Sequence, residues 1–365
     1  MIFAFRADAS PRIGAGHLMR CLTLADRLRT LGHASHFLTR DPPPHLQATI
    51  AARGHGLVGL PAAAAREKTP EDPLAPPHAD WLGGCWEEDA RACRGALAPL
   101  GADWLVVDHY ALDARWEAAL EPVCARQLAI DDLADRPHRA ALLLDVNAGR
   151  RAEDYDRWLP AGSRRLIGPR YALLRPEFAE ARAASLQRRR QPALRHILVS
   201  MGGVDLPDAS SAALAGLQAT ALPADASVTV VMGSGSPWLD KVRAQAAALR
   251  WPAEVLVDVS DMAQQMQRAD LAIGAAGGTA WERCCLGLPA VVVVLAENQR
   301  PGARALAAAG AAQLVERVDD LARRLPACLA AWSSPAALAQ AGQRAAGLVD
   351  GQGTARVCEA LLQWP

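Results

Sequence analysis

The sequence has no excess of charge of either sign. Its 365 residues include 39 lysines and arginines and 39 aspartates and glutamates, so the formal net charge is zero. Because proteins that neutralise nucleic-acid phosphates usually carry a basic excess, we do not expect a nucleic-acid partner. Hydrophobic residues make up 51% of the chain, which is too apolar for a disordered protein and sufficient for a large core.

Long hydrophobic runs are also absent. The purest apolar run covers residues 289–295 and contains four consecutive valines, whereas a membrane-spanning helix needs roughly 20 apolar residues. The chain reaches its first acid at Asp8, too early for a secretory leader with a basic start and an apolar core. We therefore expect a folded cytoplasmic protein without stable membrane insertion.

No Cys-x-x-Cys pair occurs among the eight cysteines, so the sequence signals neither a zinc knuckle nor a redox couple. Reduced structural thiols are expected instead. His33 and His36 have a spacing that could suit a metal, but no acid or third ligand lies near them in the sequence. The sequence therefore predicts no metal site, and it contains no signal for a bound cofactor.

Short apolar runs and helical segments alternate along the chain. The runs are rich in Val, Ile and Leu without polar alternation, which is typical of parallel strands buried on both faces. Segments rich in Ala, Arg and Leu between them, such as 20–31, 113–126 and 210–219, have helical character. The alternation predicts a doubly wound α/β architecture. The expected strands cover residues 2–5, 104–107, 128–130, 142–146, 197–200, 228–232, 255–257, 271–273 and 290–295.

The length suggests two domains at roughly 150 residues each. Residues 180–195 carry no strand signal and include three consecutive arginines at 188–190, so we expect a solvated linker between domains at 1–185 and 186–365. Residues 61–77 are rich in alanine and proline and predict a loop insertion. Two Rossmann-like domains would bind a ligand in an interdomain cleft, at the carboxyl ends of both sheets.

The loop after the first expected strand contains Gly14, Gly16 and His17. A dinucleotide fingerprint would need glycine or alanine where Met19 stands, and no Walker Gly-Lys-Ser/Thr follows. His17 lies near an expected helix start, where the helix dipole favours a neutral imidazole that can act as a general base. A histidine that merely hydrogen-bonds to the loop is an equal alternative from the local sequence.

Several stretches occur in an order that resembles the UDP-2,4-diacetamido-2,4,6-trideoxy-β-L-altropyranose hydrolases of pseudaminic acid biosynthesis. Together they span nearly the whole chain. They are Phe5-Arg6-Ala7-Asp8-Ala9-Ser10, Ile13-Gly14-Ala15-Gly16-His17-Leu18-Met19-Arg20, Asp108-His109-Tyr110, Ile130-Asp131-Asp132, Asp145-Val146-Asn147, Gly168-Pro169-Arg170-Tyr171 and its continuation to Phe178, and Ser200-Met201-Gly202-Gly203-Val204-Asp205.

The resemblance implies a GT-B fold, related to the transferase that adds N-acetylglucosamine in peptidoglycan synthesis, with UDP held chiefly by the C-terminal domain. Backbone amides of a glycine-rich turn can bind diphosphate oxygens without lysine. The corresponding residues are Gly277, Gly278 and Thr279 at the diphosphate, Glu282 at the ribose, Asn298 and Gln299 at the diphosphate or sugar, and Gly202 and Gly203 where the nucleotide approaches the backbone.

In the N-terminal domain, the resemblance makes His17 the general base and places Gly14 and Gly16 in the same binding loop. Asp8 is a candidate to orient His17 or to touch the sugar. Tyr110, Asn147 and Tyr171 are expected near the sugar, although polar residues that merely close strand ends would look the same in the sequence.

The implied reaction is attack of water on the anomeric carbon with inversion, which releases UDP and 2,4-diacetamido-2,4,6-trideoxy-L-altrose for nonulosonic acid synthesis and surface glycan or flagellin modification. The partner would be this UDP-sugar, and contact with neighbouring enzymes of the pathway is left open.

Two alternatives are a GT-B glycosyltransferase and a non-catalytic nucleotide-sugar binding protein. A membrane-acceptor transferase would need a basic and apolar patch. A candidate patch, which also fits an ordinary amphipathic helix, is Arg12, Arg20, Arg27 and Arg29 with Leu24, Leu28 and Leu31.

Overall fold

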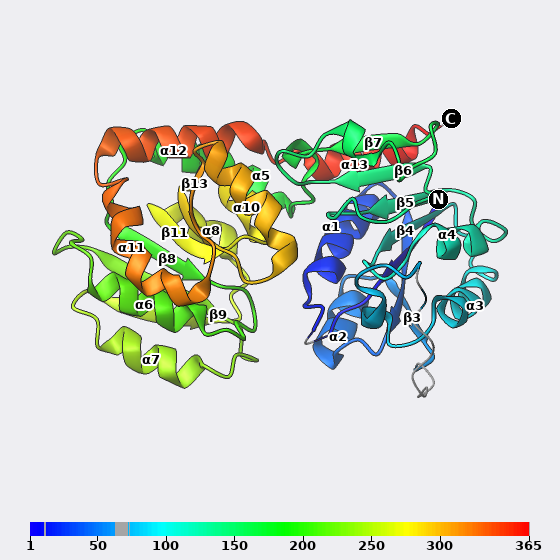
Figure 1. Cartoon of the computed structure of the whole chain (residues 1–365), viewed down its shortest axis with the longest axis horizontal. Coiled ribbons are helices and arrows are strands. Elements are labelled where there is room, and N and C mark those ends of the chain that lie inside the picture. The colour runs from blue at the N-terminus through cyan, green and yellow to red at the C-terminus, as the bar shows by residue number, and fades with distance from the viewer. Residues whose placement is uncertain (11, 63–71, 73, 365) are drawn as a thin grey trace. The chain divides into compact units, whose positions relative to one another are not determined.

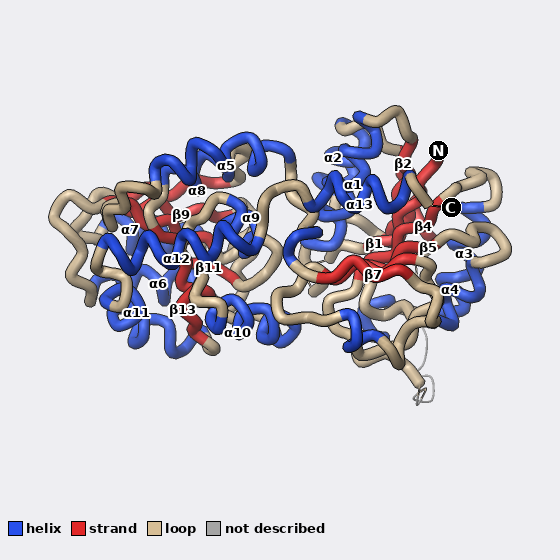
Figure 2. The backbone as a smooth tube through the Cα atoms, turned by 90° about the horizontal axis from the view of Figure 1, so that it is seen from above, coloured by secondary structure: helices blue, strands red, loops and turns tan. Residues whose placement is uncertain are grey.

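The computed structural model of the chain describes residues 1–10, 12–62, 72 and 74–364, and it divides into two compact units (Figures 1 and 2). Unit 1 comprises Met1–Leu173 and Thr354–Pro365, and unit 2 comprises Leu174–Gly353. These bounds differ in two places from the expected domains 1–185 and 186–365. Residues 174–185 belong to unit 2, and the last twelve residues return to unit 1.

A seven-stranded sheet of parallel strands forms the centre of unit 1, in the order β3-β2-β1-β4-β5-β6-β7. Its inner strands are fully buried, as expected for a sheet covered on both faces. The strands are β1 (Ile2–Ala7), β2 (Ala34–Arg40), β3 (Gly56–Leu60), β4 (Trp104–Asp108), β5 (Gln127–Ile130), β6 (Leu142–Asp145) and β7 (Arg164–Ile167).

The helices of unit 1 connect these strands. The first helix buries Leu18, Leu24 and Leu28 completely, while Arg27 and Arg29 are exposed, so it is amphipathic. Trp364, which follows the last helix, packs on this unit, and its ring meets Trp104 edge-on at 5.3 Å. The α-helices are α1 (Gly16–Thr30), α2 (Pro44–Ala52), α3 (Trp86–Leu97), α4 (Ala114–Leu120) and α13 (Gly353–Leu362), with 3₁₀ turns at Ala79–Leu82, Ala152–Tyr155 and Pro169–Tyr171.

Unit 2 has a six-stranded parallel sheet in the order β10-β9-β8-β11-β12-β13. In this unit, α6 packs on α7 and α11, while α5 packs on α8 and α9 and α12 packs on α9. The strands are β8 (His196–Ser200), β9 (Ser227–Met232), β10 (Ala253–Val257), β11 (Leu271–Ala275), β12 (Ala290–Val293) and β13 (Ala312–Val315). The helices are α5 (Pro176–Arg188), α6 (Ala209–Gln218), α7 (Leu239–Ala247), α8 (Met262–Arg268), α9 (Thr279–Cys285), α10 (Arg300–Ala308), α11 (Leu321–Ala330) and α12 (Pro335–Leu348), with 3₁₀ turns at Glu297–Gln299 and Val318–Asp320.

The predicted doubly wound α/β class is confirmed, and all nine expected strands are present. Four strands were not predicted: β2, β3, β7 and β13. Three of these lie at sheet edges, where one side is unpaired, and their partly exposed residues do not form apolar runs. β2 alternates buried and less buried residues at its start, so its apolar signal is diluted.

The expected linker over residues 180–195 is wrong in its first part, because α5 continues to Arg188 and packs into unit 2. Phe178 and Ser185 on this helix are fully buried, and the Ser185 hydroxyl donates to Leu286 O at 2.7 Å. The arginines at 188–190 are only partly solvated, since Arg189 is half-buried and donates to Met266 O at 2.8 Å. Most of the expected 61–77 loop lies outside the described residues, and its described residues form no helix or strand.

Each sheet reverses its strand order beside its first strand, between β1 and β4 in unit 1 and between β8 and β11 in unit 2. Helices diverge at such switch points, and ligands of doubly wound proteins bind at the carboxyl ends of the strands there. Among the described residues, no helix is both long and apolar enough to cross a bilayer.

Candidate functional site

His17 and Asp108 lie together at the switch point of unit 1. His17 is the second residue of α1, and Asp108 ends β4 opposite Ala7 of β1. The Nδ1 atom of His17 is 2.6 Å from Oδ1 of Asp108, and the imidazole is 9% exposed. An ionised carboxylate can only accept, so Nδ1 carries a proton and Nε2 is left as the basic nitrogen. This is the arrangement of a general base that is oriented by an acid.

Asp108 is held in its ionised form by Arg20. Burial alone would raise the pKa of Asp108, but the Arg20 guanidinium and His17 outweigh it and hold that pKa well below its usual range. Arg20 donates from Nε to Oδ2 at 2.6 Å and from a terminal nitrogen to Oδ1 at 2.7 Å. Its other terminal nitrogen reaches Asp132 at 2.7 Å. Arg20 therefore joins the carboxyl ends of β4 and β5.

Tyr110 and Asn147 join the same cluster through Asp132. The Tyr110 hydroxyl donates to the Asp132 carboxylate at 2.7 Å, and the Asn147 side-chain amide donates to Asp132 O at 3.0 Å. The Tyr110 ring meets His17 edge-on, with centroids 4.6 Å apart. Burial raises the pKa of Tyr110 well above its usual value, so the hydroxyl remains a donor. The structure thus brings together three of the residues expected in the N-terminal site.

Two further aromatic residues, Trp81 and His78, extend the cluster around His17 and Tyr110. Trp81 belongs to the 3₁₀ turn Ala79–Leu82, and its ring centroid is 6.5 Å from that of His17 and 5.5 Å from that of Tyr110. His78 packs on both Trp81 and Tyr110. Arg12, in the loop before α1, forms an ion pair with Asp80 of this turn. The segment after the expected insertion therefore supplies an aromatic wall next to the candidate base.

Asp8 does not contact His17, so the expected orienting role is wrong, whereas its other expected role, contact with the sugar, stays a prediction. Its carboxylate is bound by Arg6 at 2.5 and 2.9 Å and by the Arg40 amide at 2.8 Å, and it lies 3.2 Å from His109 Nε2. Burial would raise the pKa of Asp8, but Arg6 and His109 lower it strongly. Asp8 is thus part of a buried ion-pair network with Arg6, and Asp108 takes the position beside His17.

The remaining N-terminal candidates have more local roles in the structure. Gly14 has a φ of 77° and closes the loop through a 2.7 Å bond from its amide to Ser10 O, while Gly16 begins α1. Tyr171 lies in a 3₁₀ turn under the Arg170 guanidinium, and no contact among the described residues joins it to His17. In the candidate membrane patch, Leu24 and Leu28 are fully buried, so α1 is an amphipathic helix that faces its own core.

The glycine-rich turn of unit 2 follows β11 at the second switch point. The amides of Ala280 and Trp281 donate to Gly277 O and Gly278 O at 2.8 and 3.1 Å. Within the part of the chain that the structure describes, the amides of Gly277, Gly278 and Thr279 donate to no other group. Consecutive free amides of this kind can bind anionic oxygens.

Gln299 lies against this turn. Its Oε1 accepts from the Leu295 amide at 3.1 Å, and a Cβ atom placed on Gly277 would lie 3.5 Å from its Nε2. The Gln299 amide group therefore presents its donor nitrogen beside Gly277. Asn298 is half-buried in the same 3₁₀ turn.

Glu282 and the paired glycines complete the set expected in the C-terminal domain. The Glu282 side chain is 16% exposed, lies 3.8 Å from the Arg175 guanidinium, and has a pKa raised by burial. Gly202 and Gly203 are exposed, and Gly202 has a φ of 90° that favours glycine. Gly203 O lies so near Gly233 that a side chain at residue 233 would collide with it.

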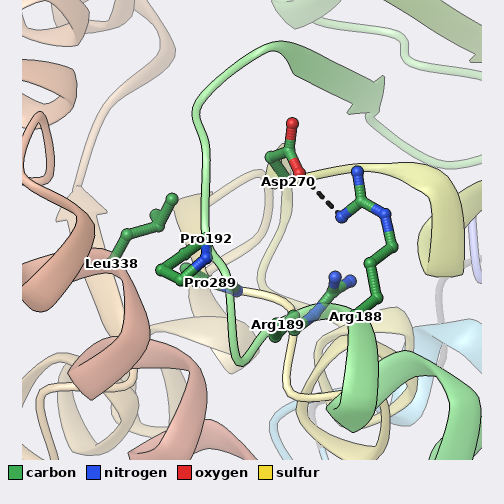
Figure 3. Close-up of a pocket in the computed structure, with 6 residues that line it drawn as sticks. All are labelled: Arg188, Arg189, Pro192, Asp270, Pro289 and Leu338. Carbon is green, nitrogen blue, oxygen red and sulfur yellow. Dashed lines mark ion pairs between the residues drawn. The ribbon is translucent and has the colours of Figure 1, made fainter.

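A cavity drawn in Figure 3 lies elsewhere in unit 2, beside residues that precede β8, β11 and β12. Its volume of about 10 Å³ suits one water molecule and no nucleotide. Arg188 and Asp270 form an ion pair of 2.6 Å at its edge. The amino ends of the strands are thus closed by packed side chains.

Sequence reasoning missed Asp108, Arg20, Asp132 and Trp81 as parts of the N-terminal site. A usable signal was present for the two acids, since Asp108 directly follows the predicted strand 104–107 and Asp132 lies two residues after the predicted strand 128–130. The carboxyl ends of neighbouring parallel strands meet at one sheet edge. For Trp81 the sequence offers no such signal.

Comparison with known proteins is consistent with this geometry. Residues 197–350 match the glycosyltransferase family 28 C-terminal domain. The spore coat polysaccharide biosynthesis protein SpsG of Bacillus subtilis is 32% identical over 201 residues, which are 54% of this chain and 57% of that relative. A UDP-2,4-diacetamido-2,4,6-trideoxy-β-L-altropyranose hydrolase of Campylobacter jejuni is 26% identical over 56% of this chain and 71% of its own length.

Solved structures match over the whole chain. MurG of Acinetobacter baumannii superimposes with a TM-score of 0.73 at 15% identity and covers 100% of this chain and 99% of its own. HepE of Anabaena, in complex with UDP and glucose, has a TM-score of 0.57 at 12% identity and covers 100% of both chains. The chain therefore has the GT-B fold that MurG has, and the match to the glycosyltransferase family 28 C-terminal domain is confined to residues 197–350.

Proposed function

We propose that this protein is an enzyme that hydrolyses a UDP-sugar to UDP and the free sugar. The observation that carries the proposal is the pairing of His17 with Asp108. A buried, ionised carboxylate fixes the imidazole so that its basic Nε2 is available, which is what activation of a water molecule requires. The similarity to the Campylobacter jejuni hydrolase supports water as the acceptor.

In the proposed reaction, His17 Nε2 removes a proton from water as the water oxygen forms a bond to the anomeric carbon. The bond between that carbon and the diphosphate oxygen breaks, and its electron pair leaves with UDP. Asp108 stabilises the imidazolium that forms, and a single displacement inverts the anomeric configuration. General-base catalysis of this kind contributes roughly 10²- to 10⁴-fold in rate.

The UDP part of the substrate is assigned to unit 2. The free amides of Gly277, Gly278 and Thr279 and the Gln299 amide would bind the diphosphate, and Glu282 would accept bonds from the ribose. Asn298 lies in the same turn as Gln299, and Gly202 and Gly203 would let the nucleotide approach the backbone. A GT-B protein that binds UDP, HepE, lends support to this assignment.

The sugar part is assigned to unit 1, beside His17, Tyr110 and Asn147. Tyr171 and the glycines at 14 and 16 remain candidates for the same subsite. The substrate we infer is UDP-2,4-diacetamido-2,4,6-trideoxy-β-L-altropyranose, with a place in cytoplasmic nonulosonic acid synthesis, because the ordered motifs resemble that hydrolase family and a curated relative carries that name.

A glycosyltransferase is the second candidate function. The match of residues 197–350 to a glycosyltransferase domain and the superposition on MurG favour it. In that case His17 would activate an acceptor hydroxyl instead of water. A non-catalytic binding protein would bind UDP without turnover, and its affinity for UDP would not change when His17 is replaced.

The test is to incubate the purified protein with the UDP-diacetamido-trideoxy sugar, without acceptor or metal, and to follow UDP and the sugar anomers by proton NMR. We expect the inverted sugar to form with the wild type and with the His45→Ala control, and not with His17→Ala. Bound UDP without turnover would refute the hydrolase for this sugar. Turnover that survives in His17→Ala would refute the assigned base.

A further inference from the structure

Arg283 is a buried cation at the switch point of unit 2, and the proposed function gives it no role. The residue lies on α9 and is 2% exposed. A Cβ atom on Gly274 would lie 2.6 Å from its guanidinium and 2.7 Å from Ser200 O. Gly274 and Ser200 are register partners on β11 and β8. The guanidinium therefore occupies the point where the carboxyl ends of the two central strands meet.

No carboxylate lies within ion-pair distance of Arg283 in the part of the chain that the structure describes, and of the carboxylates only the more distant charge of Glu282 favours its protonated form. Its nearest acid in sequence, Glu282, is directed toward Arg175 instead, and Arg283 forms no ion pair within the described residues. Its guanidinium donates to Ala275 O at 2.5 Å and to Thr279 Oγ1 at 3.3 Å, while its Nε has no partner. Burial accordingly lowers the pKa of Arg283 to about 10. An unpaired buried charge is costly, so an anion that arrives nearby is strongly favoured.

The bond to Thr279 has a further consequence. A guanidinium can only donate, so the Thr279 oxygen must act as the acceptor in that bond. The hydroxyl proton of Thr279 is then directed away from Arg283 and is available to another acceptor. Thr279 is half-buried and directly follows Gly277 and Gly278, whose amides are free. The bond from Arg283 therefore leaves the Thr279 hydroxyl free to donate its proton on the same turn as the free amides.

We propose that Arg283 is a positioning residue for the diphosphate: it supplies an unbalanced positive charge beneath the 277–279 turn and fixes the Thr279 hydroxyl as a donor toward the diphosphate oxygens. This inference rests on the proposed assignment of UDP to unit 2. It predicts that the contribution of Arg283 depends on ligand charge and is small for the nucleoside alone.

The experiment compares UDP and uridine binding by calorimetry for the wild type, Arg283→Met and Arg283→Lys. Loss of charge-assisted hydrogen bonding predicts about 10- to 100-fold weaker UDP binding for Arg283→Met. Uridine binding is expected to change less than about threefold, and Arg283→Lys is expected to recover part of the UDP affinity. A residue that only shaped the turn would weaken both ligands together.

Arg189→Met is a matched control. Arg189 is a half-buried arginine of unit 2 that, like Arg283, donates to backbone carbonyls, here those of Met266 and Ala269, and has an unpartnered Nε. It lies beside the amino end of β11 instead of the carboxyl end. Its replacement is therefore expected to leave the affinities for UDP and uridine unchanged.

Two additional measurements separate the charge effect from misfolding. Removal of an unpaired buried charge should leave the thermal midpoint of the ligand-free Arg283→Met protein unchanged or higher. Thr279→Val should weaken UDP binding and Thr279→Ser should retain it, and the effect of Thr279→Val should be smaller in the Arg283→Met background.

Equal UDP affinity in wild type and Arg283→Met, or a parallel loss of uridine binding, would overturn the inference. No UDP binding by the wild type would instead overturn the proposed function.

Discussion

His138 is expected to make the stability of unit 1 depend on pH above neutrality. It is almost completely buried, with Nδ1 2.7 Å from Glu117 on α4 and Nε2 3.8 Å from Asp131 after β5. Burial would lower its pKa, but Glu117 and Asp131 outweigh burial and the opposing Arg136 charge, so the pKa of His138 rises to about 9. The charged form is therefore the one that the folded protein prefers.

The sign and size of the effect follow from this pKa. The folded-state pKa of about 9 lies above the unfolded value of 6.5, so the stabilisation is complete below about pH 6.5 and is lost as the pH rises through 9. At about 1.36 kcal/mol per pKa unit, the protonated His138 contributes about 3 kcal/mol. Between pH 6.5 and 9 the free energy of unfolding should fall by that amount.

The assay is urea unfolding of the wild type and His138→Gln at several values between pH 6 and 10, with NMR titration of the histidine Cε1 protons. The variant should be less stable by about 3 kcal/mol at pH 6 and nearly equal to the wild type at pH 10. His45→Gln, which changes an exposed histidine, should keep the wild-type profile. A His138 that titrates below pH 7, or a His138→Gln protein with the wild-type slope, would refute the reasoning.

Two more predictions concern the switch points, and a third concerns α3. Asp108→Asn should slow release of UDP from the proposed substrate about 10²- to 10⁴-fold, because the amide has no negative charge to stabilise the imidazolium and no longer fixes the proton on Nδ1 of His17; an unchanged rate would contradict the assigned pair. Gly274→Ala should lower the unfolding free energy by about 1–3 kcal/mol, because its Cβ would press on Arg283 and Ser200. Gly95→Ala, in a helical position with open space around the new Cβ, should raise it by about 0.5–1 kcal/mol. Equal thermal midpoints for the two glycine variants would be inconsistent with both predictions.

The fold was largely predictable because buried parallel strands produce short apolar runs. Strands such as β4 and β11 are paired on both sides and covered on both faces, so nearly every residue must be apolar. Edge strands do not meet that condition. β7 contains two arginines and β10 has only partly buried or exposed residues, and β10 was found only because it still contains three apolar residues in sequence.

The site was predictable only where its residues are adjacent in the sequence. His17 was recognised from its loop, but its carboxylate partner lies 91 residues later on β4. Asp8 was a candidate to orient His17 because it is near in sequence, yet its carboxylate is bound by Arg6 instead. Local sequence gives no information about which of two acids a histidine will meet, since strand order decides it. The boundary at 173/174 has the same origin, because tertiary packing assigns α5 to unit 2.

The two switch points differ in how their buried charges are balanced. In unit 1, Arg20 lies between Asp108 and Asp132, and Arg6 lies between Asp8 and Asp89, so each buried cation faces carboxylates. Such a site gains little from a further anion, but it suits a neutral sugar and a proton transfer. In unit 2, Arg283 is buried without a carboxylate beside a turn with free amides. The diphosphate is the charged part of a UDP-sugar, and the unit with the unbalanced cation is the one that favours it.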